Sequence, residues 1–366
     1  TCVEHPDSDH LHITTVDLGD GIPTQIVCGA ANVAAGQHVV VATVGTKLYD
    51  GDKEFAIKKS KIRGVESFGM ICAEDEIGVG TSHDGIIELP ETVKPGTLAK
   101  DYYNVKDDYM FEVDLTPNRI DAASHFGVAR DLAAWMKAQG MQADLHSPSV
   151  DAFHSDRADG AIPVEVECQE AAIRYAGLTI RGVKVAESPE WLRNYLTAIG
   201  QRPINNVVDI TNFILNAYCQ PLHCFDLAKV KGNKIVVRPA AEGSKFVTLD
   251  GVERTMTARD LMICNAEEPM CIAGVFGGLE SGVTEQTTDI FLESACFHPT
   301  WVRKTARRQG LNTDASFRFE RGVDPNNVIY ALKAAALLVK ELAGGEICGE
   351  ISDFYPAPVE RPTVEL

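Results

Sequence analysis

The sequence predicts a multi-domain α+β protein, in which a small β-rich domain precedes a helical segment and a larger mixed domain. Three observations support this prediction. The 366 residues are too many for one ordinary hydrophobic core, and about two or three domains are expected. Roughly the first hundred residues form short apolar runs separated by Gly and Asp turns, whereas helical patterns begin after about residue 105. The composition, 45% hydrophobic and 23% charged, is typical of a soluble globular protein.

The β-rich region, residues 1–105, contains about five or six short strand-like runs, a spacing that indicates a small barrel or a sandwich. It also carries a cluster of cations: Lys53, Lys58, Lys59, Lys61 and Arg63. A lysine-rich run is usually a solvated strand edge that blocks aggregation, and taken alone this cluster favours that structural interpretation.

Residues 106–155 have a helical pattern followed by a polar linker. Ser124 can cap a helix that ends at Gly140 and carries Val128, Leu132 and Trp135 on one face. Residues 156–355 then alternate helical and strand patterns, and we predict one mixed domain there, with 356–366 beginning a linker to further domains. The elements predicted in it are helices over 188–200, 203–221 and 324–345, a strand over 234–240, and a hairpin over 245–257.

Cysteine spacing and hydropathy indicate the compartment. The ten cysteines include no CxxC pair, and most lie inside apolar runs, so we expect reduced thiols, no metal site and a cytoplasmic protein. No run is long and apolar enough to span a bilayer, and no membrane partner is expected. The chain begins with Thr1, and we expect it to be a piece of a longer protein.

The strongest charge contrast lies between Leu292 and Pro325. Glu293 ends an apolar run, and the residues that follow are locally basic although the formal net charge of the protein is −18. A cationic strip on an acidic protein predicts a local anionic partner, and a phosphate backbone is the natural candidate. The cations of this strip are Arg303, Lys304, Arg307, Arg308, Arg318 and Arg321.

Three segments place polar groups in apolar surroundings. Thr211 and Asn212 lie within a helical pattern, with His223 shortly after its end; Gly274 lies in a glycine-rich turn; and Glu293 lies in a strand. The glycines do not match a nucleotide-binding loop. Taken one by one, a structural histidine, a plain turn and an edge carboxylate are the favoured interpretations.

Longer motifs in the β-rich region resemble a known family. The stretches HPDSDHLHITTVDLG, QIVCGAANVAAGQHVVVATVGTKL and IKKSKIRGVESFGMICAEDEIG resemble the tRNA-binding oligonucleotide-fold (OB-fold) domain. This resemblance implies a five-stranded Greek-key barrel whose lysines contact phosphates without reading sequence. The candidate tRNA contacts in this domain are Lys58, Lys59, Lys61 and Arg63.

The three polar segments, taken in order, resemble the editing (B3/B4-type) domain of the bacterial phenylalanyl-tRNA synthetase β-subunit family. The matching stretches are VVDITNFILNAYCQPLHCFD, IAGVFGG and LESACFHPTWVRKTARRQGLNTDASFRFERGVDP. The resemblance implies hydrolysis of Tyr-tRNA(Phe) by this chain without a cofactor. It also implies that the complete enzyme attaches phenylalanine to tRNA(Phe) with ATP and Mg²⁺, as a heterotetramer with an α subunit. The helical part of 106–155 resembles half of a small domain.

The resemblance also assigns roles to individual residues. Glu293 would accept the hydrogen bond of the substrate phenol, His223 would help hold the substrate, and Ala315 would line the wall beside the ring. Arg202 resembles a family residue near the end of the tRNA, and the charge of the basic strip makes Arg307 and Arg308 further candidate tRNA contacts. The implied editing site consists of Thr211, Asn212, Pro221, His223, Gly274, Glu293, Thr313 and Ala315.

The expected mechanism follows from selectivity. A synthetic pocket for phenylalanine rejects a molecule that only adds a hydroxyl by no more than about 10²-fold, so a second site must recognise that hydroxyl. No Ser/His/Asp or Cys/His nucleophile pattern is present, which favours attack by a positioned water, with His223 as a general base left open. Two other function classes also stay open: a non-catalytic module for tRNA binding and subunit assembly, and a purely structural role.

Overall fold

The computed structural model describes residues 1–50, 53–80, 82–105, 109–360 and 363–365. Residues 106–108 of the predicted helical segment, and 361–362 and 366 of the predicted linker, lie outside the described residues. The chain divides into two compact units, Thr1–Tyr109 and Met110–Leu366. Residues 110–155 thus belong to the second unit; the finer domain boundaries given above stay predictions.

The first unit is built from short antiparallel strands, as the turn-rich sequence predicts. Its described strands form five separate hydrogen-bonded sheets, which do not close into a barrel. Small clusters around Ile26 and Cys72 form its core. The sheets are β1 (Cys2–Glu4), β2 (His12–Asp17) and β3 (Pro23–Cys28); β5 (Val41–Thr43) with β10 (Gly69–Ile71); β4 (His38–Val39) with β11 (Glu88–Leu89); β6 (Lys47–Asp50) with β7 (Lys53–Ala56); and β8 (Ser60–Ile62) with β9 (Val65–Ser67), followed by helix α1 (Ala99–Tyr102).

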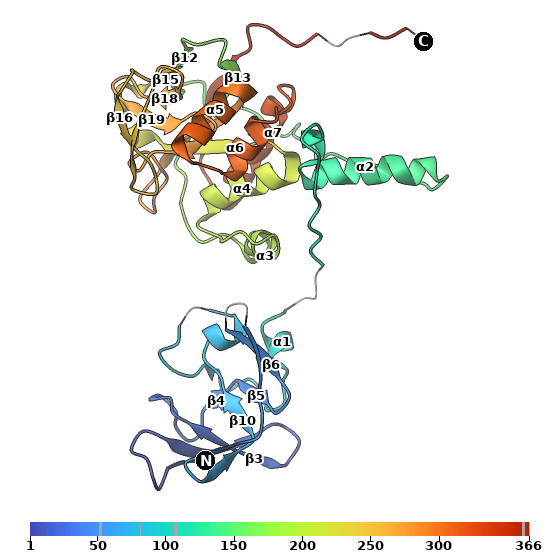
Figure 1. The fold of residues 1–366 in the computed structure, drawn as a ribbon, viewed down its shortest axis with the longest axis vertical. Helices are drawn as coiled ribbons and strands as arrows, with labels where there is room; N and C mark the ends of the chain where they lie inside the picture. Colours follow the sequence, from blue (N-terminus) through green and yellow to red (C-terminus); the bar gives the residue numbers. More distant parts are fainter. Residues whose placement is uncertain (51–52, 81, 106–108, 361–362, 366) are drawn as a thin grey trace. The chain divides into compact units, whose positions relative to one another are not determined.

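The second unit begins with helix α2 (His125–Ala138), which extends away from the body of the unit (Figure 1). Its predicted cap is confirmed, because the Ser124 side chain accepts a hydrogen bond from the N–H of Gly127. Phe126, near the start of the helix, packs against Tyr218. The predicted apolar face beyond it is exposed, including Trp135 with 58% of its surface accessible.

Two sheets and five further helices form the body of this unit. The first sheet has the antiparallel order β14 (Leu222–Asp226), β21 (Asp289–Phe297), β13 (Ala172–Arg181) and β22 (Glu346–Phe354). The second has the order β12 (Val164–Val166), β15 (Ile235–Pro239), β18 (Leu261–Cys264), β19 (Pro269–Ile272) and β20 (Phe276–Gly277), with a hairpin of β16 (Lys245–Val247) and β17 (Glu253–Thr255). The helices are α3 (Glu190–Ala198), α4 (Asn206–Tyr218), α5 (Pro299–Gln309), α6 (Asp314–Phe319) and α7 (Asn327–Ala343).

The predicted helices over 188–200, 203–221 and 324–345 are confirmed as α3, α4 and α7, and the predicted hairpin as β16 and β17. One large hydrophobic core joins these elements. Seven of the ten cysteines are buried, and the structure shows all ten as free thiols. None of the described helices is long and apolar enough to cross a membrane.

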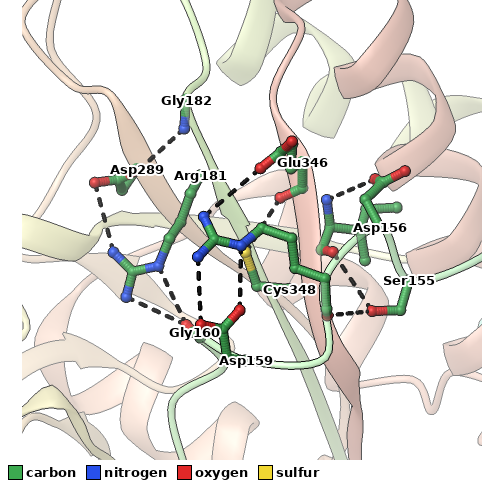
Figure 2. A network of polar contacts seen from close by, with 11 residues as sticks. Ser155, Asp156, Asp159, Gly160, Arg181, Gly182, Asp289, Glu346 and Cys348 are labelled. Atoms are coloured by element: carbon green, nitrogen blue, oxygen red, sulfur yellow. Dashed lines mark hydrogen bonds and ion pairs between the residues drawn. The ribbon is translucent and has the colours of Figure 1, made fainter.

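A strap of residues 155–160 lies along the edge strand β22 and is held by charged side chains (Figure 2). Asp156 accepts two hydrogen bonds from Lys340 Nζ at 2.7 and 2.8 Å and one from the N–H of Ile347 at 2.9 Å. Arg181 donates to the carbonyl of Gly160 at 3.2 Å. The strap therefore connects the segment before β12 to the sheet that carries the candidate site.

We expect Asp156→Asn to lower the free energy of unfolding by about 1–2 kcal/mol at pH 7, because an amide cannot replace the ionised acceptor of Lys340. Lys340 lowers the pKa of Asp156 below its ordinary 3.8. The difference should therefore vanish as the pH falls from about 4 through that lower value. Urea denaturation at several pH values measures this, with the exposed Asp159→Asn as a control expected to remain close to wild type. Equal effects of the two variants would contradict the assignment.

Candidate functional site

Glu293, the buried carboxyl residue of the candidate site, lies on strand β21 of the second unit. Alternate residues of a strand point to opposite faces, and Ser294 donates to the carbonyl of Val328 in α7 at 2.9 Å. Glu293 therefore points to the other face, away from α7. In the register of the sheet Glu293 pairs with Gly177 of β13 on one side and with His223 of β14 on the other. Glu293, expected to contact the substrate phenol, and His223, expected to hold the substrate, are thus direct neighbours.

Glu293 is buried, with 5% of its surface exposed. The hydroxyl of Tyr175 donates to its Oε2 at 2.9 Å, and Oε1 has no hydrogen-bond partner among the described residues. Burial raises the pKa of Glu293 to about 8, and the hydrogen bond from Tyr175 opposes that rise. Oε1 of this carboxyl group is therefore left without a protein partner in the described chain, and the group is mostly protonated at neutral pH.

His223 is half-buried on β14, and its ring packs edge-on against Phe225 with centroids 4.5 Å apart. Its Nε2 is inaccessible to solvent and has no hydrogen-bond partner in the described part of the chain. Burial lowers the pKa of His223 to about 4, so the ring is neutral at pH 7. A neutral imidazole with a free nitrogen can bind a ligand atom, but it is a weak base.

The turn between β19 and β20 brings Gly274 to the far end of the same face. Its φ is +68°, and a Cβ there would lie 2.9 Å from Phe319 and 3.0 Å from Phe297, which only glycine avoids. Thr313 caps α6 and donates to the carbonyl of Val275 at 2.9 Å. Ala315 lies in the first turn of α6. Gly274, Thr313 and Ala315 are thus held together beside Phe297, four residues along β21 from Glu293.

The predicted site residues of α4, Thr211 and Asn212, make no direct contact with the Glu293 carboxyl group through a hydrogen bond in the described chain. The hydroxyl of Thr211 donates to a carbonyl of its own helix at 2.7 Å. Asn216 donates to the carbonyl of Asn212 at 2.9 Å and accepts from Arg318 of α6 at 3.3 Å, so this side of α4 faces α6. Pro221 is buried at the start of β14. No hydrogen bond among the described residues joins the predicted α4 residues to the carboxyl group of β21.

Two further residues shape the site and were not predicted. Tyr175 supplies the only hydrogen bond that the carboxyl group of Glu293 makes within the described chain. Gly177 leaves space for the ring of Phe291, whose Cζ would lie 2.0 Å from a Cβ at that position. Both residues belong to an apolar strand pattern, RYAGLTI, and only the register with β21 shows which of them faces Glu293.

The basic strip divides into two classes. Arg308 forms an ion pair with the buried Asp260, and Arg318 and Arg321 bind groups of α4 and α6. The remaining cations are exposed without an ion pair among the described residues: Arg303, Lys304 and Arg307. Their position on one side of α5 leaves a cationic surface on an acidic protein.

The other predicted tRNA contacts are also exposed. Arg202 lies on the loop before α4. In the first unit, Lys59 pairs with Glu66 at 2.8 Å and Arg63 donates to the carbonyl of Asp7 at 2.8 Å. Lys58 and Lys61 are exposed and form no ion pair with a described residue.

Two family models match the chain. The family described as "Putative tRNA binding domain" matches residues 1–98, and the B3/4 domain family matches residues 171–344. The phenylalanine–tRNA ligase β subunit of Bacteroides fragilis is 71% identical over 366 residues, which is 100% of this chain and 45% of that protein. The chain belongs to the phenylalanine–tRNA ligase β-subunit family.

Other β subunits extend this comparison. That of Porphyromonas gingivalis is 63% identical over 367 residues (100% of this chain, 45% of that protein), and that of Desulfotalea psychrophila 48% over 356 residues (97% and 42%). The chain spans less than half the length of these β subunits. A crystal structure of an N-terminal fragment of the Pyrococcus horikoshii phenylalanyl-tRNA synthetase β subunit has a TM-score of 0.35 at 17% identity, covering 63% of this chain and 60% of that one.

Proposed function

We propose that this chain binds tRNA(Phe) and hydrolyses tyrosine wrongly attached to it, as part of a phenylalanine–tRNA ligase. The complete enzyme would attach phenylalanine with ATP and Mg²⁺, as a cytoplasmic heterotetramer with an α subunit; no step of the editing reaction is assigned to these cofactors. One observation carries the proposal. Within the B3/4 match, the buried carboxyl group of Glu293 lies beside His223, and neither Oε1 of the one nor Nε2 of the other has a partner in the part of the chain that the structure describes.

The first unit would supply tRNA affinity. The tRNA-binding family match and its short antiparallel strands support an OB-fold over residues 1–105, followed by a partial helical domain to 155, an editing domain over 156–355 and a linker from 356. Lys58 and Lys61 would contact phosphates, since they have no carboxylate partner among the described residues, and Lys59 and Arg63 would support them. In the second unit Arg202 and Arg307 would approach the acceptor end, whereas Arg308 is occupied by Asp260.

Selectivity would come from Oε1 of Glu293. A tyrosine ring entering beside His223 would pair its hydroxyl with this oxygen, so that both polar groups are satisfied. A phenylalanine ring would bury the same oxygen without a partner, at a cost of about 1–3 kcal/mol. The correctly charged tRNA is therefore spared.

Hydrolysis would use a positioned water. The N–H of Gly274 makes no hydrogen bond within the described chain, so it can stabilise the oxyanion that forms on the ester carbonyl. His223 is assigned to holding the substrate, because a pKa of about 4 makes it a poor acceptor of the water proton at pH 7. Thr211, Asn212, Pro221, Thr313 and Ala315 would complete the wall of the site.

The test is deacylation of Tyr-tRNA(Phe) and Phe-tRNA(Phe) by the complete ligase. We expect the tyrosyl ester to be hydrolysed about 10²-fold faster or more, because the site must be built around the hydroxyl. Equal and slow hydrolysis of both esters, with tRNA still bound, would favour the alternative of a tRNA-binding and assembly module. Loss of both hydrolysis and tRNA binding in the complete enzyme would instead support a purely structural role.

A further inference from the structure

Tyr175 connects the candidate site to the centre of the sheet. It lies on β13, two residues before the Gly177 that pairs with Glu293, and its side chain is fully buried. Its ring packs at 6.4 Å from that of Phe297. With its ring enclosed by the core, the hydroxyl has little freedom to leave Oε2 of Glu293, which it binds at 2.9 Å.

We propose that Tyr175 is a specificity-determining positioning residue, whose hydroxyl occupies Oε2 of Glu293 and thereby reserves Oε1 for the phenol of the substrate. This inference rests on the proposed editing function. It assigns two phenols to one carboxyl group: a resident one from β13 and a transient one from the mischarged tRNA. Without the resident phenol, either oxygen could turn toward the substrate, and neither would be held in place.

The same hydrogen bond fixes the location of a proton. Burial raises the pKa of Tyr175 well above its ordinary value, so its hydroxyl remains a donor. Because the carbonyl oxygen of a neutral carboxyl group is a better acceptor than its hydroxyl oxygen, the hydrogen bond to Oε2 favours placing the proton of a neutral Glu293 on Oε1. Oε1 then donates to the substrate phenol when Glu293 is neutral and accepts from it when Glu293 is ionised. The other titratable groups facing this carboxyl are His223 from β14 and Cys271 from β19, and both are uncharged at neutral pH.

The test compares Tyr175→Phe with Tyr330→Phe in the complete ligase. Tyr330 lies on α7 and donates to the carbonyl of Pro148, so it is a matched loss of one hydroxyl outside the site. We expect Tyr175→Phe to lower kcat/KM for Tyr-tRNA(Phe) about tenfold, to leave Phe-tRNA(Phe) hydrolysis unchanged, and to raise the apparent pKa of the pH–rate profile. Tyr330→Phe should leave all three unchanged.

A second variant keeps the ring and hydroxyl in place. Site-specific 3,5-difluorotyrosine at position 175 is a stronger donor, so it should move the apparent pKa of the profile downward while the protein remains folded. If both changes at 175 left the Tyr/Phe ratio and the pH profile at wild-type values while Glu293→Ala abolished selectivity, the role of Tyr175 would be refuted and the editing function would stand. If Glu293→Ala also had no effect, the proposed function itself would be wrong, and this inference with it.

Discussion

Replacing Glu293 by alanine is expected to reduce the preference for Tyr-tRNA(Phe) over Phe-tRNA(Phe) about 100-fold, while the protein still folds. The carboxyl group is the buried group proposed to form a hydrogen bond with the substrate hydroxyl, and its loss removes the proposed partner of that hydroxyl. Deacylation kinetics with both esters measure the ratio. Glu341→Ala, an exposed carboxylate on α7, is the matched control and should retain the wild-type ratio.

Glu293→Gln adds a thermodynamic readout with a defined sign. The folded pKa of about 8 lies above the ordinary 4.5, so wild-type stability is fully present below pH 4.5 and falls as the pH rises toward 8. The glutamine variant has no such proton to lose. The free energy of unfolding of Glu293→Gln, relative to that of wild type, should therefore increase by about 2–5 kcal/mol as the pH rises from 5 to 9. Parallel pH dependences in urea denaturation would show that Glu293 is not buried as described.

Gly177→Ala is expected to destabilise the protein by about 3 kcal/mol or more and to abolish editing. A Cβ at this position would lie 2.0 Å from Cζ of Phe291, and the ring has no free volume to move into at 1% exposure. Because Phe291 and Glu293 share a face of β21, moving the ring also disturbs the carboxyl group. Denaturation and deacylation measure the two effects.

The control for this change is Gly282→Ala, because a Cβ there meets no atom within 4 Å. Its effect should stay within about 0.5 kcal/mol. The double variant Gly177→Ala/Phe291→Leu should recover part of the lost stability, since a smaller side chain relieves the clash. A Gly177→Ala protein as stable as wild type would mean that the close packing of these strands is not as described.

Local signals made most helices of the second unit predictable from the sequence. Ser124 caps α2 as expected, and the apolar periodicity located α4 and α7. Those signals lie within a few residues of one another, and the same holds for the turn at Asp250 and Gly251. Local signals do not reveal which other element a helix packs against. The apolar face predicted for α2, for example, is exposed in this unit.

For the candidate site, too, the sequence identified individual residues but not all of their contacts. The sequence motifs identified Glu293 and His223, and the register places them side by side. They could not identify Tyr175, which lies 118 residues before Glu293 and meets it only through strand pairing. The motifs also could not show which cations of the strip are paired and which are free to bind an anion, because Arg308 is paired with Asp260, 48 residues earlier. Tertiary packing between distant segments decides whether a charge such as that of Arg308 is paired inside the protein.

The buried thiols of the second unit can report how often its core opens. Burial raises the pKa of Cys271 and Cys224 well above the ordinary value, and that of Cys296 to about 12. A thiol in this state neither ionises nor meets an electrophile until the strand that holds it opens. Alkylation of these cysteines therefore proceeds at the rate at which the core exposes them; Cys224 and Cys296 report the opening of the sheet that carries Glu293, and Cys271 that of the other sheet.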